Sequence, residues 1–332
     1  MDREWLIALP KAEVHLHLEG CVPAGLLADA AARRGVDPGV ETPDVTNLGQ
    51  LLASLDRSCG LIDRAEDLTT IAYEAAERAT ASGARHIDVI VNPTHWPHFE
   101  GHLAILVEAL DSGFAAAEAD GHATAALCVS LKRTQTRTES VALVQQLLEA
   151  SHPRVAGLSI DGDESEGSHN DRFAEAFALA AGGGLRRCAH AGESSGPEGV
   201  REAIDLLGAE RIDHGVRSRE DPALVAELVA RAIPLDICPS SNVILGLVSD
   251  LAAHPVGAFE RAGIRFSLNT DDPLLYGIDL VGEYERCART FGWGHDTVSR
   301  IARTSIESCF APPDRRAALL EDLDRFLAGP RI

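Results

Sequence analysis

The sequence predicts an α/β fold, a (β/α)₈ barrel in a single domain spanning residues 1–332. Eight short runs rich in β-branched and aliphatic residues recur along the chain, and a longer segment with helical spacing follows each run. Strand followed by helix, repeated eight times, is typical of a closed barrel. The alternative, a doubly wound sheet, is disfavoured because no G-x-G-x-x-G follows the first strand. The run Gly182 to Gly184 precedes a strand instead of opening a helix.

The eight predicted strands comprise, in order, residues 13–20, 85–93, 124–133, 155–164, 186–194, 211–216, 234–242 and 265–273. Helical spacing is clearest in residues 68–83, which stop at Gly83, and in residues 140–150, which follow Thr138 and Glu139.

Two further segments complete the predicted barrel. Residues from about 21 to 84 alternate less clearly between strand and helix, and residues 43–68 within them predict extra helices inserted after strand 1. Such an insertion lies at the face of the barrel where βα loops build active sites, and it could form a lid. Residues 313–329 predict one amphipathic helix that packs outside the barrel.

Composition excludes several classes of partner. A formal net charge of −21 argues against nucleic acid, since phosphate binding relies on Lys and Arg. No apolar run reaches the roughly 18 residues that span a bilayer, and the amino terminus lacks a signal-peptide pattern, which predicts a cytoplasmic location. Seven cysteines without CxxC spacing are expected to be reduced core residues. We therefore expect a small-molecule ligand; the sequence leaves a homo-oligomer open.

The stretch EVHLHLEG, residues 13–20, places two histidines one residue apart in an apolar run. Alternate side chains of a strand share a face, so His15 and His17 are expected to project together. The ends of later predicted strands supply His190, His214, Asp271 and Asp272. Carboxyl ends of barrel strands converge, and neutral imidazoles with a carboxylate suit Zn²⁺ or another divalent transition metal at an open site.

These motifs resemble the adenosine/AMP deaminase branch of the metal-dependent amidohydrolases. The resemblance rests on KAEVHLHLEG, DGDESEG, HAGES, RIDHGV, CPSSN and SLNTDDP, which occur in order between residues 11 and 273. It implies hydrolytic deamination of a 6-aminopurine nucleoside to the 6-oxo purine and ammonia. It also implies one zinc ion per subunit, with the ligands His15, His17, His190 and Asp271.

The resemblance further implies roles for residues around the metal. His214 would orient or deprotonate the attacking water, and Glu193 would carry a proton to ring N1; Asp271 is counted with them as catalytic. The residues implied for the substrate are His17, Glu19, Gly162 through its backbone near N3, and Asp272 at N7. Asp271 and Asp272 reach one site only if the chain turns there, which Pro273 favours.

A second metal is the alternative for the metal centre. Related two-metal enzymes usually bridge their ions with a carboxylated lysine on a barrel strand. The chain has only Lys11 and Lys132, and neither lies in the fourth predicted strand. One metal is therefore favoured. Lys132, in the third predicted strand, is the residue that would bridge two ions in the alternative.

The choice of substrate is open because the chain departs from the family pattern. Glu19 stands where these enzymes commonly have an aspartate that binds the ribose 5′-hydroxyl, and Ser159 stands where many have an acid. Candidates are adenosine, deoxyadenosine, free adenine and a 5′-altered nucleoside such as aminodeoxyfutalosine. AMP is disfavoured because the motifs offer no Arg or Lys cluster. The rivals are an amidohydrolase acting on a pterin or cytosine-like ring and a non-catalytic purine-binding protein.

One loop after the second strand carries unassigned histidines. Its residues His95, His98 and His102 predict a solvated specificity loop, with a second metal as the alternative. Trp96 or Phe99 in the same loop could stack on a base.

Overall fold

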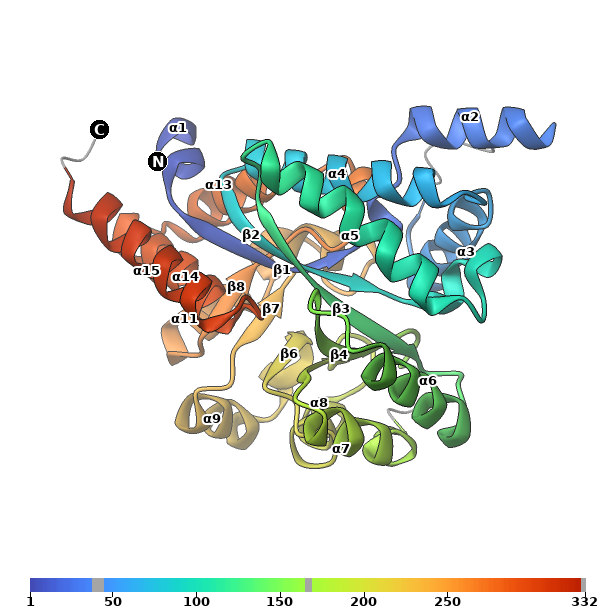
Figure 1. Cartoon of the computed structure of the whole chain (residues 1–332). Coiled ribbons are helices and arrows are strands. Elements are labelled where there is room, and N and C mark those ends of the chain that lie inside the picture. The colour runs from blue at the N-terminus through green and yellow to red at the C-terminus, as the bar shows by residue number, and fades with distance from the viewer. Residues whose placement is uncertain (38–44, 165–168, 330–332) are drawn as a thin grey trace.

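The computed structural model describes residues 1–37, 45–164 and 169–329, and it contains the predicted barrel of eight parallel strands with flanking helices (Figure 1). Each predicted strand is present, and the sheet order follows the chain from the first strand to the eighth. The strands are β1 Lys11–His17, β2 Ala84–Val91, β3 Thr124–Lys132, β4 Val155–Asp161, β5 Arg186–Ala191, β6 Arg211–His214, β7 Leu235–Ile237 and β8 Phe266–Leu268. They end earlier than predicted because the polar residues at their carboxyl ends belong to loops.

The barrel closes between β1 and the segment that follows β8. The backbone N–H of His17 donates to the carbonyl of Asp271 at 2.8 Å, and the N–H of Asp271 donates to the carbonyl of His15 at 3.2 Å. Leu16 and Asp271 form a parallel bridge at the same point. The seam of the barrel therefore passes through three of the residues that the sequence singles out.

Fifteen α-helices are present in the described part of the chain. They are α1 Arg3–Ala8, α2 Ala24–Arg34, α3 Leu48–Cys59, α4 Ala65–Ala81, α5 Leu103–Ala119, α6 Arg137–Ala150, α7 Ala174–Gly182, α8 Pro197–Asp205, α9 Pro222–Arg231, α10 Pro239–Ile244, α11 Val256–Ala262, α12 Pro273–Tyr276, α13 Leu280–Phe291, α14 His295–Ser308 and α15 Pro313–Ala328. None of these is long and apolar enough to cross a bilayer.

The helix predicted at residues 140–150 begins earlier than expected. Thr136 caps α6, and its hydroxyl accepts from the backbone N–H of Glu139 while the Glu139 carboxylate accepts from the backbone N–H of Thr136. This reciprocal capping box satisfies two N–H groups that a helix start leaves unpaired. The prediction that the helix follows Thr138 and Glu139 is therefore wrong by about one turn.

The insertion and the terminal helix lie at different places on the barrel. Helices α2 and α3 lie at the right of Figure 1, while α1 and α15 lie at the left. Pro43 and Asp44, at the start of the predicted insertion, lie outside the described residues. The tail helix is confirmed as α15, whose buried side chains are Leu319 and Leu323.

The core is a continuous apolar cluster that contains side chains from the strands and from the helices around them. All seven cysteines are buried and free of disulfides, as expected for reduced core residues. The assignment of residues 1–332 to a single domain stays a prediction.

A buried arginine holds the barrel interior together on the amino-terminal side of β6. Arg211 opens that strand, and its guanidinium lies 2.5 Å from a carboxylate oxygen of Asp88 and 2.7 Å from one of Asp236. It also donates to the carbonyl of Val14 at 2.9 Å and lies over the ring of Phe310, with 3.8 Å between the guanidinium carbon and the ring centroid. One side chain thus connects strands β1, β2, β6 and β7.

Replacing this arginine is expected to destabilise the barrel strongly. Arg211→Met leaves Asp88 and Asp236 buried without their cation, which costs about 3–5 kcal/mol in the free energy of unfolding. Arg231→Met is the control, because Arg231 is exposed and its pairs lie on the surface, where a loss of less than about 1 kcal/mol is expected. Urea unfolding of both variants measures the difference, and equal losses would contradict a structural role for the Arg211 cluster.

Candidate active site

Five polar side chains from four strand ends surround one point in the barrel mouth. Ligand atoms of His15, His190, His214 and Asp271 all lie within 4.8 Å of one another. His17 adjoins this group, since its Nε2 lies 3.1 Å from His190 Nε2 and 3.3 Å from Asp271 Oδ1. We call these five side chains the metal-ligand cluster. The structure therefore brings together all the residues that the sequence singled out as metal ligands.

Neighbouring groups orient the imidazoles toward this point. His15 Nδ1 lies 3.4 Å from the carbonyl oxygen of Asp236, while its Nε2 lies 3.1 Å from Asp271 Oδ1. His190 Nδ1 lies 3.1 Å from the carbonyl oxygen of Ile160 and 3.3 Å from a carboxylate oxygen of Asp213. Acceptors at Nδ1 fix the tautomer that keeps the lone pair on Nε2, as in metal-binding histidines.

Asp271 reaches the centre through a left-handed backbone turn. Its φ is +66°, a conformation uncommon for a residue other than glycine, which indicates that the surroundings impose it. The hydroxyl of Ser241 donates to Asp271 Oδ2 at 2.6 Å and leaves Oδ1 toward the histidines. The expected turn after strand 8 is present, and both Asp271 and Asp272 border the cavity.

The electrostatics of the cluster fit a divalent metal ion. Burial lowers the pKa of His17 to about 4, so this imidazole is neutral and offers a lone pair. Against the effect of burial, the interaction with His15 holds the pKa of Asp271 well below its usual range. The buried Nε2 of His15 has no hydrogen-bond partner. Against the effect of burial, the hydrogen bond to Asp213 raises the pKa of His190 to about 9, so this imidazole would release a proton when it binds an ion. Imidazoles and an ionised carboxylate are a donor set that suits Zn²⁺.

His214 belongs to the metal-ligand cluster, and it faces Glu193, which lies beside the cluster. His214 Nε2 lies 3.4 Å from Glu193 Oε1, and His214 Nδ1 lies 3.3 Å from the side-chain nitrogen of Asn242. Burial, followed by the nearby charge of Asp271, raises the pKa of Glu193 to about 8. A carboxyl group that keeps its proton near neutral pH is able to act as a general acid. The pair is therefore placed for proton transfer.

The loop that carries Glu193 is held by Glu164, a residue to which the sequence gave no role. Glu164 Oε2 accepts from the backbone N–H groups of Glu193, Ser194 and Ser195, at 2.9, 3.0 and 3.3 Å. Arg133 donates to the other oxygen of Glu164 and to the carbonyl of His190. The motif DGDESEG contains this carboxylate; residues 165–167 of the motif lie outside the described part.

A small cavity opens next to the metal-ligand cluster. Its volume is about 40 Å³, and its lining includes Glu193, His214 and Asp272 together with four leucines of α3, which are Leu48, Leu51, Leu52 and Leu55. The expectation that the insertion after strand 1 contributes to the site is therefore confirmed. The apolar wall excludes water from one side, which strengthens electrostatic interactions within the cavity.

Glu19 and Asp161 border the same cavity, and Asn92 connects them. The backbone N–H of Asn92 donates to Glu19 Oε1 at 2.9 Å, and its side-chain amide donates to Asp161 Oδ1 at 2.6 Å. The indole N–H of Trp96 also donates to Glu19 Oε1 at 2.9 Å. Sequence reasoning assigned no role to Asn92 or Asp161, since their polar groups meet only in the folded barrel.

Two glycines are required at this site. A Cβ on Gly20 would lie 2.5 Å from the Cα of Asp272, so only glycine allows this close approach of the two segments. Gly162 has a φ of +99°, in the region that favours glycine. Its place at the cavity edge agrees with the backbone contact that the resemblance implies.

The loop after β2 is less exposed than the sequence predicted. His98 and His102 are exposed, but His95 and Trp96 are buried, so the loop is not a wholly solvated segment. His95 Nδ1 lies 2.6 Å from a carboxylate oxygen of Asp56. The indole N–H of Trp96 donates to Glu19 Oε1 and thereby helps to fix this carboxylate. Within the described residues, these three histidines form no metal cluster.

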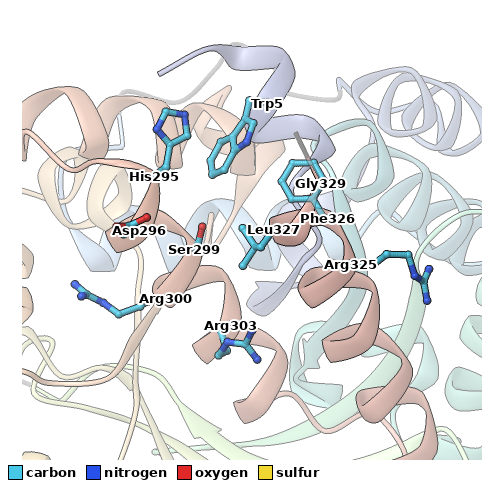
Figure 2. Close-up of a pocket in the computed structure, with 10 residues that line it drawn as sticks. All are labelled: Trp5, His295, Asp296, Ser299, Arg300, Arg303, Arg325, Phe326, Leu327 and Gly329. Carbon is cyan, nitrogen blue, oxygen red and sulfur yellow. The ribbon is translucent and has the colours of Figure 1, made fainter. Parts of the chain in front are cut away.

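A wider cavity lies elsewhere, among α1, α14 and α15, and Figure 2 shows its lining residues. Its volume is about 510 Å³, but its arginines are engaged with carboxylates: Arg300 with Glu260, Arg303 with Asp324, and Arg325 with Asp322. The described ligand cluster does not border it. The smaller cavity is therefore the candidate active site.

Known proteins resemble this chain over nearly its whole length. The family model described as adenosine deaminase matches residues 10–326. The adenine deaminase of Sphingopyxis alaskensis is 34% identical over 334 residues, which cover 97% of this chain and 96% of that protein.

Solved structures match over nearly the whole chain. The crystal structure of an adenine deaminase from Arthrobacter aurescens is 31% identical, with a TM-score of 0.90, and the match covers 97% of this chain and 100% of that one. The structure of an amidohydrolase from Burkholderia ambifaria with bound zinc is 29% identical, with a TM-score of 0.87, over 98% of this chain and 93% of that one.

Removing the carboxylate at the barrel seam is expected to release the metal. Asp271→Ala deletes the oxygen that lies 3.1 Å from His15 Nε2 and 3.3 Å from His17 Nε2, so zinc content should fall well below one equivalent. Asp272→Asn is the control and should keep the metal. Elemental analysis of the purified proteins measures both, and a fully loaded Asp271→Ala variant would remove Asp271 from the ligand set.

Proposed function

We propose that this chain, which belongs to the adenosine deaminase family, acts on free adenine and converts it with water to hypoxanthine and ammonia. Hydrolytic deamination of purines is the activity of the family. The single observation that carries the choice of free adenine is the small size, about 40 Å³, of the cavity that the clustered histidines and Asp271 line.

Enzymes of this family depend on a metal, and the residues here fit one zinc ion. His15, His17, His190 and Asp271 would hold it, because their free Nε2 and Oδ1 atoms face one point. When bound, such an ion lowers the pKa of a coordinated water toward neutrality. Lys132 does not border the cavity, which supports a single ion over a lysine-bridged pair.

The proton transfers are assigned to Glu193 and His214. Glu193 carries a proton at neutral pH and gives it to ring N1, which makes C6 more electrophilic. Burial holds the pKa of His214 well below its usual range, so the neutral imidazole is available to orient the attacking water and accept its proton. The distance of 3.4 Å between the two side chains places them on the same side of the cavity. The proton taken from water then passes from His214 to the C6 amino group, which leaves as ammonia. The C6 hydroxyl gives its proton to Glu193 and becomes the 6-oxo group.

The shape of the cavity supports the bare base over the nucleoside. A water molecule requires about 10–15 Å³ of such space, so the cavity holds only a few waters. The bare base therefore requires a smaller displacement of the surrounding side chains than a base that carries a ribose. Leucines of α3 cover one side, and Glu19, which the family pattern relates to a ribose hydroxyl, is tied to Trp96 and Asn92. The name of the Sphingopyxis alaskensis relative supports the same choice.

The substrate is tested by measuring the loss of 6-aminopurine absorbance with adenine, adenosine, deoxyadenosine and AMP. We expect kcat/KM for adenine to exceed that for adenosine by about a hundredfold or more, since the leucines of α3 and the fixed Glu19 leave a sugar little space. Equal kcat/KM values for adenine and adenosine would contradict the choice of adenine. No activity on any 6-aminopurine in a zinc-loaded preparation would contradict deamination of 6-aminopurines.

The proton donor is tested with Glu193→Gln. This variant should keep its zinc and lose roughly a hundredfold or more in kcat, as expected when a general acid is removed. Glu198→Gln is the matched control, because Glu198 is exposed at the start of α8, and its kcat should stay near that of the parent. Near-normal turnover by Glu193→Gln would exclude Glu193 from the proton transfer.

A further inference from the structure

The cavity contains more hydrogen-bond acceptors than the deamination chemistry uses. Three carboxylate oxygens that line it are buried and have no hydrogen-bond partner: Glu19 Oε2, Asp161 Oδ2 and Asp272 Oδ1. A buried acceptor without a donor is unfavourable, so such atoms indicate where a ligand supplies N–H groups. Asp272 is already assigned to purine N7, which carries no hydrogen in this form of the base, so Asp272 meets it as a protonated carboxyl group that donates. Glu19 and Asp161 remain unexplained.

The position of Asp161 relates it to one edge of the ring. It directly precedes Gly162, whose backbone is assigned to N3. In a purine, N9 is bonded to the same carbon as N3 and lies across the ring system from C6. A base whose C6 faces the metal ligands and whose N3 faces Gly162 therefore directs N9 toward Asp161 and Glu19.

The two carboxylates are held rigidly by the groups behind them. Asn92 donates to one oxygen of each, and Trp96 donates to the same oxygen of Glu19, so the second oxygen of each remains toward the cavity. The Trp96 side chain is fully buried. This support leaves the carboxylates little freedom to move aside for a substituent at N9.

We propose that Asp161 accepts a hydrogen bond from the N9–H of the free base, and that Glu19 closes the space beyond N9, so that an unsubstituted N9 is required. This inference rests on the proposed function and identifies the residues that distinguish base from nucleoside. Adenine carries one ring N–H, and a nucleoside carries none because its sugar occupies N9. A nucleoside would leave the Asp161 oxygen unpaired and would collide with Glu19, whereas the base satisfies the acceptor.

The first test uses the parent enzyme with adenine and 9-methyladenine, which differ only by a methyl group in place of the N9 hydrogen. A hydrogen bond to a charged acceptor corresponds to a factor of about 10–100 in the rate constant, so kcat/KM should fall by at least that factor for 9-methyladenine. Equal turnover of the two would overturn the inference and leave adenine deamination standing. An enzyme that deaminates neither compound nor any other 6-aminopurine would overturn both.

The second test locates the discrimination in Asp161. For Asp161→Ala, kcat/KM for adenine should fall about 10- to 100-fold, while kcat/KM for 9-methyladenine should stay unchanged or rise. The ratio of kcat/KM for adenine to that for 9-methyladenine therefore decreases. Equal losses on both substrates would indicate a merely structural role and overturn the assignment. The isosteric Asp161→Asn, which loses the charge, should give a partial loss confined to adenine.

Asp163→Ala is the matched control for the Asp161 variants. Asp163 lies two residues further along the same loop and is exposed, so the ratio between adenine and 9-methyladenine should stay at the parent value. A narrowed ratio in this control would show that the loop as a whole sets the preference, and would overturn the specific role of Asp161.

Discussion

The backbone pairing between β1 and the segment after β8 is the interaction on which the site depends. Its two hydrogen bonds join His15 and His17 to Asp271, so the contact that closes the barrel also sets the carboxylate beside the imidazoles. The left-handed φ of Asp271 follows from this pairing, because the chain must turn there to reach β1. Stability of the barrel and geometry of the metal ligands are therefore coupled in one place.

The remaining parts of the site are built on this seam by buried polar contacts. Ser241 orients Asp271, Asp213 orients His190, and Glu164 fixes the loop of Glu193 through three backbone N–H groups. These partners offset the cost of removing the charges of Asp271, Asp213 and Glu164 from water. The oxygens without partners in the cavity face the space that the substrate would occupy, where binding supplies the missing donors.

The sequence predicted the barrel, and the convergence of the polar residues at its strand ends, for a physical reason. Apolar runs identify buried parallel strands, and polar residues at their carboxyl ends are constrained to converge, so His15 and His214 could be placed without coordinates. Contacts between loops carry no such periodicity. The support of Glu193 by Glu164 and the link between Glu19 and Asp161 through Asn92 depend on how loops pack, and the burial of His95 and Trp96 was missed for the same reason.

Zinc titration of the metal-free protein tests the central claim most directly. Adenine deamination is followed while zinc is added to a chelator-treated preparation of known concentration. If the four ligands at the strand ends hold a single catalytic ion, activity should be absent at the start, rise in proportion to added zinc and level off at one equivalent per chain. Full activity without metal, or a plateau reached only at two equivalents, would contradict the account.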